Sequence, residues 1–320
     1  MVEVIYDGGL GNWLFQYCFG RILAETLGYK LVAKPIPVFP GTYDLVDGHD
    51  FSLEKMLILR GQKPDLTFIK NVDSKYHLLL TGYFQRYEYY EHHAQRIRDW
   101  LAVKDHIQFN ARVNDVILSI RRGRDYIPQY GLPISYYEDA LASIDFDRVF
   151  ICTNEPDDPF IQFLKKKYNA TVRGGGFQRG LVGENYLSEA LDNFLFIKKF
   201  NKIVISNSSF PWWAAFLSDA SEIVFPRPTN GLWSPNDLNS KNISLEVNED
   251  RYRYLNCEKY KSEFLSEIIR NYYDETIVSA KSQLKKWFPV LRKKRQAKEG
   301  RVFRFHEDSD DQNRSVGTTP

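Results

Sequence analysis

Three runs of small and polar residues carry the side chains of this chain that could do chemistry. They are a glycine loop at residues 8–12 (GGLGN), an arginine run at residues 121–125 (RRGRD) and a serine run at residues 206–209 (SNSS). Each run follows a segment that is predicted to be a β-strand. Backbone N–H groups at a helix start and the forked side chain of arginine both bind phosphate oxygens. The pattern therefore indicates a ligand that carries phosphate, although the glycine loop alone is equally typical of a tight turn.

The two arginines at the end of a buried strand, Arg121 and Arg122, are expected to have different functions. Neighbouring residues in an extended segment point to opposite sides. We therefore predict that one arginine faces the ligand and that the other braces the loop. A purely structural cluster of ion pairs is the alternative, because buried arginines need anionic partners.

The serine run leads directly into a predicted helix. Ser209 is a plausible N-cap, and Pro211 fits the first turn of that helix. Hydroxyl groups together with unpaired N–H groups at a helix start make an anion site. The two tryptophans that follow, Trp212 and Trp213, are expected in the core rather than on a sugar-binding surface.

The elements that must position these residues alternate between strands and helices. Strands are expected at residues 2–6, 30–33, 77–82, 116–120, 148–153, 171–173, 202–206 and 223–225. Helices are expected at residues 13–27, 87–101, 136–143, 160–168, 188–200 and 212–218. This alternation predicts an α/β fold of two Rossmann-like halves with a cleft between them, and ligands bind such sheets beyond the carboxyl ends of the strands.

The predicted halves and tail follow the same pattern. An N-terminal domain with the glycine loop covers residues 1–107, and a second domain covers residues 108–250. A helical segment is expected at 251–290, and a basic and then polar, disordered tail at 291–320. Basic and aromatic residues interleave between 281 and 304, which is typical of a peripheral membrane contact but equally of a solvated helix.

Bulk properties narrow the possible classes of protein. The chain has 320 residues, of which 43% are hydrophobic, and a net charge of +2, so it is expected to be globular and not to bind nucleic acid. Its three cysteines lie far apart, which argues against a disulfide framework or a structural zinc site. No secretory signal or membrane-spanning stretch is visible, so a cytoplasmic location is expected.

Taken together, the motifs resemble glycosyltransferase family 11, the α-1,2-fucosyltransferases, within the wider α-1,2/α-1,6/O-fucosyltransferase group. The family motif GGLGNQLFQYAFG corresponds to GGLGNWLFQYCFG at residues 8–20. The motif GYFQ is present at residues 82–85 and is followed by Ile97-Arg98. The motif SNSSFSWWGAWL corresponds to SNSSFPWWAAFL at residues 206–217.

The resemblance implies an inverting GT-B-like enzyme that needs no metal or other cofactor and uses a GDP-sugar as co-substrate. The residue that matches the arginine holding the donor β-phosphate is Arg121. Asp192 matches a carboxylate that reads guanine. Ser208 and Ser209 match positions that hold the diphosphate, and Asn12 matches a residue close to the sugar. The implied partners are GDP-fucose and a glycan or lipid-linked oligosaccharide acceptor. The resemblance also implies that residues 1–107 form the acceptor-side domain and residues 108–250 the domain that binds the nucleotide sugar.

The chain departs from the family pattern in three places. The histidine of the family motif HxRRGD is Ser119 here, which we keep as a candidate donor-binding residue. An additional residue, Arg124, displaces the acid of that motif to Asp125, our candidate general base. Trp13 replaces the usual glutamine next to the cleft. These changes leave room for another sugar or acceptor, or for a non-catalytic carbohydrate-binding relative.

Two other classes of enzyme fit the sequence less well. Asp145-Phe146-Asp147 resembles the DxD triplet of metal-dependent transferases, but it precedes a strand, at the wrong edge of the sheet for a site. A dehydrogenase would need GxGxxG and an acid at the end of the second strand. Leu14 occupies the place of the third glycine, and Lys34 follows the second strand instead of an acid.

Overall fold

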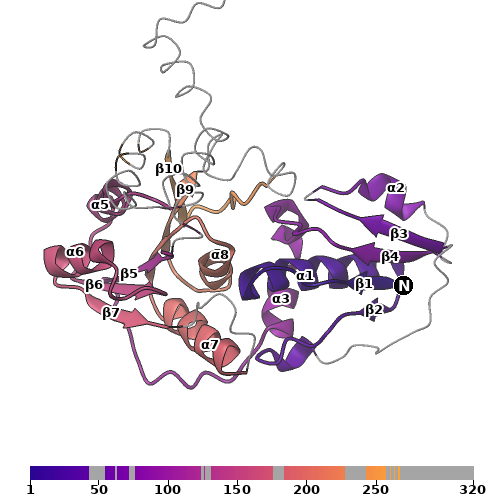
Figure 1. Ribbon diagram of the computed structural model, residues 1–320, viewed down its shortest axis with the longest axis horizontal. Helices are drawn as coiled ribbons and strands as arrows, with labels where there is room; N and C mark the ends of the chain where they lie inside the picture. Colours follow the sequence, from indigo (N-terminus) through magenta and orange to yellow (C-terminus); the bar gives the residue numbers. More distant parts are fainter. Residues whose placement is uncertain are drawn as a thin grey trace, which may run out of the picture.

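The computed structural model describes two parallel β-sheets, each in its own half of the molecule (Figure 1). The described residues are 1–42, 55–61, 63–71, 76–123, 126, 131–175, 184–227, 243–256, 260, 263 and 266. The chain is thus a mixed α/β protein with two Rossmann-like halves in a GT-B-like arrangement, as the sequence predicts. The basic segment at 281–304 lies outside the described residues.

The N-terminal half contains a four-stranded sheet in the order β2-β1-β4-β3. Its strands are β1 (Val2–Val4), β2 (Leu31–Val32), β3 (Met56–Leu59) and β4 (His77–Leu80). Its helices are α1 (Leu10–Leu27), α2 (Leu66–Lys70) and α3 (Ala94–Trp100). Short 3₁₀ turns lie at Pro40–Thr42, Tyr87–Tyr89 and Glu91–His93. Gly28 ends α1 in the left-handed conformation (φ 66°), which a glycine adopts without steric strain.

The C-terminal half contains a six-stranded sheet in the order β10-β9-β8-β5-β6-β7. Its strands are β5 (Asp115–Ile120), β6 (Arg148–Thr153), β7 (Thr171–Gly174), β8 (Lys202–Ile205), β9 (Glu222–Arg227) and β10 (Tyr252–Asn256). Its helices are α5 (Ile134–Ala142), α6 (Pro159–Tyr168), α7 (Glu184–Lys198) and α8 (Ser209–Phe216).

Numbered within its own half, the second sheet has the Rossmann order 3-2-1-4-5-6, and all its strand pairs are parallel. The order reverses between β5 and β8. Ligands of open α/β sheets bind at such a switch point, beyond the carboxyl ends of the strands. The arginine run follows β5 and the serine run follows β8, so both of these runs lie at the switch point. In the first sheet β1 and β4 are neighbours, and their carboxyl ends lead into the glycine loop and the GYFQ motif.

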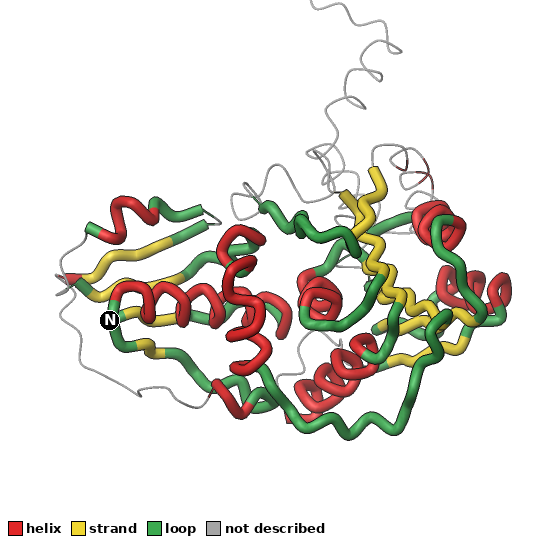
Figure 2. The backbone as a smooth tube through the Cα atoms, turned by 180° about the vertical axis from the view of Figure 1, so that it is seen from behind, coloured by secondary structure: helices red, strands yellow, loops and turns green. Residues whose placement is uncertain are grey.

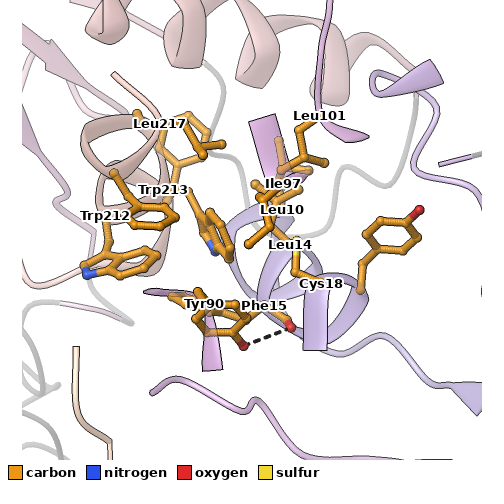
Figure 3. Close-up of a cluster of buried hydrophobic side chains, with 14 of the residues drawn as sticks. Leu10, Leu14, Phe15, Cys18, Tyr90, Ile97, Leu101, Trp212, Trp213 and Leu217 are labelled. Atoms are coloured by element: carbon orange, nitrogen blue, oxygen red, sulfur yellow. Dashed lines mark hydrogen bonds between the residues drawn. The ribbon is translucent and has the colours of Figure 1, made fainter. Parts of the chain in front are cut away.

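The two halves share one apolar core where α1 meets α8 (Figure 1). Phe15 of α1 packs against the rings of both Trp212 and Trp213, at centroid distances of 5.0 and 4.7 Å. The hydroxyl group of Tyr90 donates a hydrogen bond to the carbonyl of Phe15 at 3.2 Å, as Figure 3 shows. Both tryptophans are fully buried, which confirms their predicted place in the core. Seen from behind in Figure 2, the described chain crosses between the halves along the linker after α3.

The contact between α1 and α8 depends on a residue without a side chain. A Cβ atom on Gly11 would lie 2.5 Å from the backbone nitrogen of Phe210 and 2.7 Å from the carbonyl carbon of Ser209. Both are backbone atoms, so no side-chain movement could relieve the clash. Gly11 therefore sets how closely the two helix starts can approach.

Some elements differ from the sequence prediction. The helix expected at 87–101 consists of two 3₁₀ turns and the shorter α3, because Tyr90 and His93 donate to carbonyls three residues back. Residues 252–256, expected in a C-terminal helical segment, form β10, since their main chain pairs with β9 in parallel register. β3 and α2 were not predicted at all. No helix in the described part of the chain is long and apolar enough to cross a membrane.

We expect Gly11→Ala to destabilise the protein by about 1–3 kcal/mol, because an added methyl group would overpack a backbone contact. Chemical denaturation monitored by tryptophan fluorescence measures this loss. Gly9→Ala is the matched control, because its Cβ atom would meet only the Tyr186 hydroxyl group, at an ordinary contact distance of 3.4 Å. Equal stability of the two variants would contradict the close packing of α1 on α8.

Candidate functional site

Asn12 connects the carboxyl edges of the two sheets. Its side-chain oxygen accepts a hydrogen bond from Gln85 Nε2 at 3.0 Å and another from the hydroxyl group of Ser209 at 2.8 Å. Gln85 belongs to the segment after β4, whereas Ser209 begins α8 in the other half. The predicted donor-binding residues Asn12 and Ser209 are therefore in direct contact, although they are 197 positions apart.

The helix starts that meet here lack the usual side-chain caps. Gly9 precedes α1 and Ser208 precedes α8, and neither makes a side-chain capping hydrogen bond. Neither helix has an acidic residue in its first turn. The amino end of a helix carries a partial positive charge and unpaired N–H groups. Two such ends in contact favour the binding of an anion between or beside them.

The turn between β8 and α8 buries polar groups that lack partners. Ser206 and Ser208 are 1% and 4% exposed, and neither hydroxyl group makes a hydrogen bond within the described part of the chain. Buried hydroxyl groups are normally hydrogen-bonded, so an unpaired pair of them is consistent with a bound ligand. The backbone also corrects one prediction. Ser208 is the N-cap, with extended torsion angles, and Ser209 is the first helical residue.

The two neighbouring arginines point in different directions, as predicted. Arg122 is 3% exposed, and its Nε donates to Asp158 at 3.1 Å while its guanidinium group lies over the ring of Phe160. Its backbone N–H donates to the side chain of Asn154. Arg122 is thus the residue that braces the loop.

Arg121 is half-buried and lies on the side of β5 that faces the N-terminal half. Its guanidinium group is 4.7 Å from the ring centre of Tyr126. Burial raises the pKa of the Tyr186 phenol, and the nearby positive charge of Arg121 partly opposes this rise. Ser119, two residues earlier on the strand, is 6% exposed, and its carbonyl accepts a hydrogen bond from the backbone of Ser206.

Tyr186 is a site residue that the sequence did not reveal. It extends from α7 to the glycine loop of the other half, where its hydroxyl group lies beside Gly9 and close to the backbone of Leu10. Nothing in the spacing of the sequence marks this tyrosine among the 20 of the chain. It joins the glycine loop to Arg121.

Asp192 lies on α7 between two cationic side chains. Its Oδ1 is 2.6 Å from Nε2 of His106, and its Oδ2 is 3.8 Å from Arg173. The hydrogen bond with Asp192 raises the pKa of His106. His106 belongs to the linker between the halves, so the pair ties the linker to α7. A carboxylate has lone pairs left for further donors in this arrangement.

A second carboxylate lies beside the glycine loop. Asp7 follows β1 and is exposed, and its Oδ2 accepts a hydrogen bond of 2.6 Å from the hydroxyl group of Tyr83. Its Oδ1 accepts from the backbone of Gly8. In the sequence, the one feature that could have identified Asp7 as a site residue is its position directly after a predicted strand. The predicted base, Asp125, and its neighbour Arg124 lie outside the described residues.

Asp145-Phe146-Asp147 occupies the connection between α5 and β6, at the amino end of the strand, as predicted. It is therefore at the opposite edge of the sheet from Arg121. Among the described residues no group of three His, Cys, Asp or Glu side chains is arranged to hold a metal ion.

The motifs and their geometry agree with a comparison against known protein families. Residues 45–231 match the family described as glycosyl transferase family 11. The chain belongs to glycosyl transferase family 11. A search of the curated proteins gives no match.

Solved structures of low sequence identity are also similar to this family 11 protein. A mutant of Arabidopsis thaliana FUT1 in complex with GDP is 14% identical, with a TM-score of 0.44 over 72% of this chain and 71% of that one. NodZ alpha-1,6-fucosyltransferase soaked with GDP-fucose is 11% identical, with a TM-score of 0.38 over 69% and 93% of the two chains. The same enzyme co-crystallized with GDP is 12% identical over the same shares, with a TM-score of 0.39.

The two arginines are expected to respond differently to substitution. Arg122→Gln should lower the free energy of unfolding by about 3 kcal/mol, because it leaves Asp158 without its buried partner. Arg121→Gln should change stability by less than about 1 kcal/mol. Urea unfolding of both variants measures the difference. A greater loss of stability for Arg121→Gln would reverse the functions assigned to the two side chains.

The pairing of His106 with Asp192 predicts a pH-dependent contribution to stability. Because the pKa of His106 is raised in the folded protein, the contribution is fully present below its ordinary value of 6.5 and is lost as pH rises through the folded pKa. The melting temperature of His106→Gln should therefore fall furthest below that of the wild type between about pH 5 and 6.5. His92→Gln, at an exposed histidine outside the site, is the control. A difference that grows above pH 8 would contradict the pair.

Proposed function

We propose that this protein transfers fucose from GDP-fucose to a hydroxyl group of a glycan acceptor, inverting the anomeric centre without a metal ion. The observation that carries the proposal is the switch point of the second sheet, where Arg121 and two unpaired serine hydroxyl groups meet uncapped helix starts. Membership of family 11 supports the choice of donor, and the similar FUT1 and NodZ structures were solved in complex with GDP or soaked with GDP-fucose. Family resemblance alone suggests the 2-hydroxyl group of galactose as acceptor.

The departing GDP needs positive charge near its β-phosphate as the bond to the sugar breaks. Arg121 and the start of α8, with Ser208 and Ser209, would stabilise that charge. Such preorganised donors cost no reorganisation when the charge develops. Removing one typically slows turnover about 100- to 1000-fold. Asn12 would hold the glycine loop against this group and contact the sugar.

Guanine recognition is assigned to Asp192. A carboxylate accepts from guanine N1–H and the 2-amino group together, whereas adenine offers no such pair of donors. His106 and Arg173 orient the Asp192 side chain in the absence of a base. They would act as positioning residues for the reading of guanine.

The acceptor hydroxyl group requires a base near the sugar. The sequence suggests Asp125 through the family motif. The contacts of Asp7 make it the second candidate, because Tyr83 and Gly8 hold its carboxylate beside the glycine loop. Comparing Asp7→Asn with Asp125→Asn decides between them. The variant that lacks the true base should lose transfer activity while its affinity for GDP stays unchanged.

The basic segment at 281–304 would bring the enzyme to a membrane that carries a lipid-linked acceptor. Binding of the protein to anionic liposomes, and its loss on deletion of the residues after Ala280, tests this part of the proposal. Alternative functions are transfer from another nucleotide sugar and carbohydrate binding without catalysis. Ser119 and the inserted Arg124 motivate both alternatives.

A thermal-shift panel tests the donor class. GDP and GDP-fucose should raise the melting temperature, whereas UDP and NAD should not. At a ligand concentration of 100 times the dissociation constant, the added free energy of unfolding is about 2.7 kcal/mol. Stabilisation by GDP with no hydrolysis or transfer of GDP-fucose would favour the binding protein. Equal stabilisation by UDP-sugars would remove the proposed guanine recognition.

Substitution of Arg121 tests the phosphate contact. Arg121→Gln should reduce transfer at least 100-fold while leaving the melting temperature nearly unchanged. The matched control is Arg112→Gln, an exposed arginine that precedes the same strand at its opposite end. Transfer rates from labelled GDP-fucose give the comparison. Full activity of Arg121→Gln would rule out its contact with the leaving group.

A further inference from the structure

A pocket of about 360 Å³ opens between the two halves beside the linker that joins them. Its walls come from α3 and the residues after it, from the carboxyl end of α7 and from the segment after α8. These are the opposite ends of α7 and α8 from the candidate phosphate contacts at Arg121, Ser208 and the glycine loop. At 1.5 Å per helical residue, the pocket is separated from the starts of these helices by roughly 12–20 Å. It is therefore separate from those phosphate contacts, whereas the proposed guanine contacts are nearer, because His106 follows the lining residue Asp105 and Asp192 precedes Phe194 by two positions.

Charged side chains surround the mouth of this pocket, and most of them are paired. Arg98 is 3.1 Å from Asp219, and its two Nη atoms donate to the carbonyls of Leu217 and Ser218 at 2.9 and 3.1 Å. Lys199 forms an ion pair with Asp105. These pairs hold α3 and the linker against the ends of α7 and α8.

Lys198 is the exception among the basic residues of the pocket. It is half-buried, and its ammonium group has no ion-pair partner in the described part of the chain. The ring of Phe194 lies 5.8 Å away. Burial lowers the pKa of Lys198 and the nearby Arg98 acts in the same direction, whereas Asp219 and Asp105 oppose this shift without forming an ion pair with Lys198. An unpaired charge in such a place destabilises the empty pocket and favours an anion.

Two kinds of N–H donor remain for that anion. The ammonium group of Lys198 offers three, and a guanidinium group has five, of which Arg98 uses three on protein acceptors. The oxygens of a phosphate group match this number of donors better than the two oxygens of a carboxylate. The pocket volume also leaves room for a small organic group against Leu101 and Phe194.

We propose that this pocket binds a phosphate group, either inorganic phosphate or that of a small phosphate ester, through Lys198 and Arg98. Because both halves and the linker line the pocket, its occupant would hold the halves in the arrangement that brings α1 to α8. The same chain would then bind phosphate at two separate places, the candidate donor site and this interdomain pocket.

Phosphate titration of the full-length protein, followed by melting temperature at constant ionic strength with chloride as reference, tests the proposal. Phosphate should stabilise the wild type, and Lys198→Gln should weaken the apparent affinity about tenfold or more. Lys199→Gln is the matched control, because it removes a neighbouring charge that already has a partner. The Arg121→Gln variant, which impairs the candidate donor site, should still be stabilised by phosphate.

Failure would take several recognisable forms. The proposal would be overturned if phosphate stabilised Lys198→Gln as much as the wild type, or if phosphate stabilised neither. It would also be overturned if only Arg121→Gln lost the stabilisation by phosphate. The last result would assign the phosphate to the candidate donor site.

Amine labelling gives a readout that does not depend on the stability of a variant. In the wild type, phosphate and glycerol phosphate should slow the acetylation of Lys198 severalfold, measured by mass spectrometry, while the labelling of Lys167 stays unchanged. The relative effects of the two compounds show whether an ester is preferred. Equal protection by acetate would contradict a site for phosphate, and labelling of Lys198 unaffected by any anion would contradict a site altogether.

Discussion

The close contact between the starts of α1 and α8 is the constraint on which the rest of this protein depends. Gly11 permits it, because its Cβ position is filled by the backbone of Ser209 and Phe210. The side-chain oxygen of Asn12 aligns the two helix starts, because it accepts hydrogen bonds from both halves of the protein. The buried aromatic residues behind it, Phe15 and Trp213 among them, make the contact part of one core rather than a loose interface between domains.

This contact has an electrostatic consequence. Two positive helix ends in contact repel each other unless an anion or an acidic cap compensates, and neither helix has such a cap. Arg121 adds a full positive charge on the same side of the second sheet. The repulsion between these positive charges is strongest where a diphosphate would bind, so the proposed ligand would stabilise the interface. The proposed interdomain pocket would act on the same interface from the far ends of α7 and α8.

Much of the fold could be predicted from the sequence because apolar runs and glycine or proline breaks mark its strands and helices locally. The opposite directions of Arg121 and Arg122 follow from the geometry of an extended chain, and the bracing contacts of Arg122 confirm that argument. The ligand contact of Arg121 stays a prediction. The contacts of Tyr186, His106 and Tyr83 could not be predicted, because each joins segments that only packing brings together. The cap of α8 was misplaced by one residue, since side-chain type alone does not separate Ser208 from Ser209.

A crystal structure of the protein with GDP would test the central claim most directly. The account predicts that the β-phosphate lies within hydrogen-bond distance of Arg121 and of the hydroxyl group of Ser208, with guanine against Asp192. A diphosphate bound away from the starts of α1 and α8, or a base that does not contact Asp192, would contradict it.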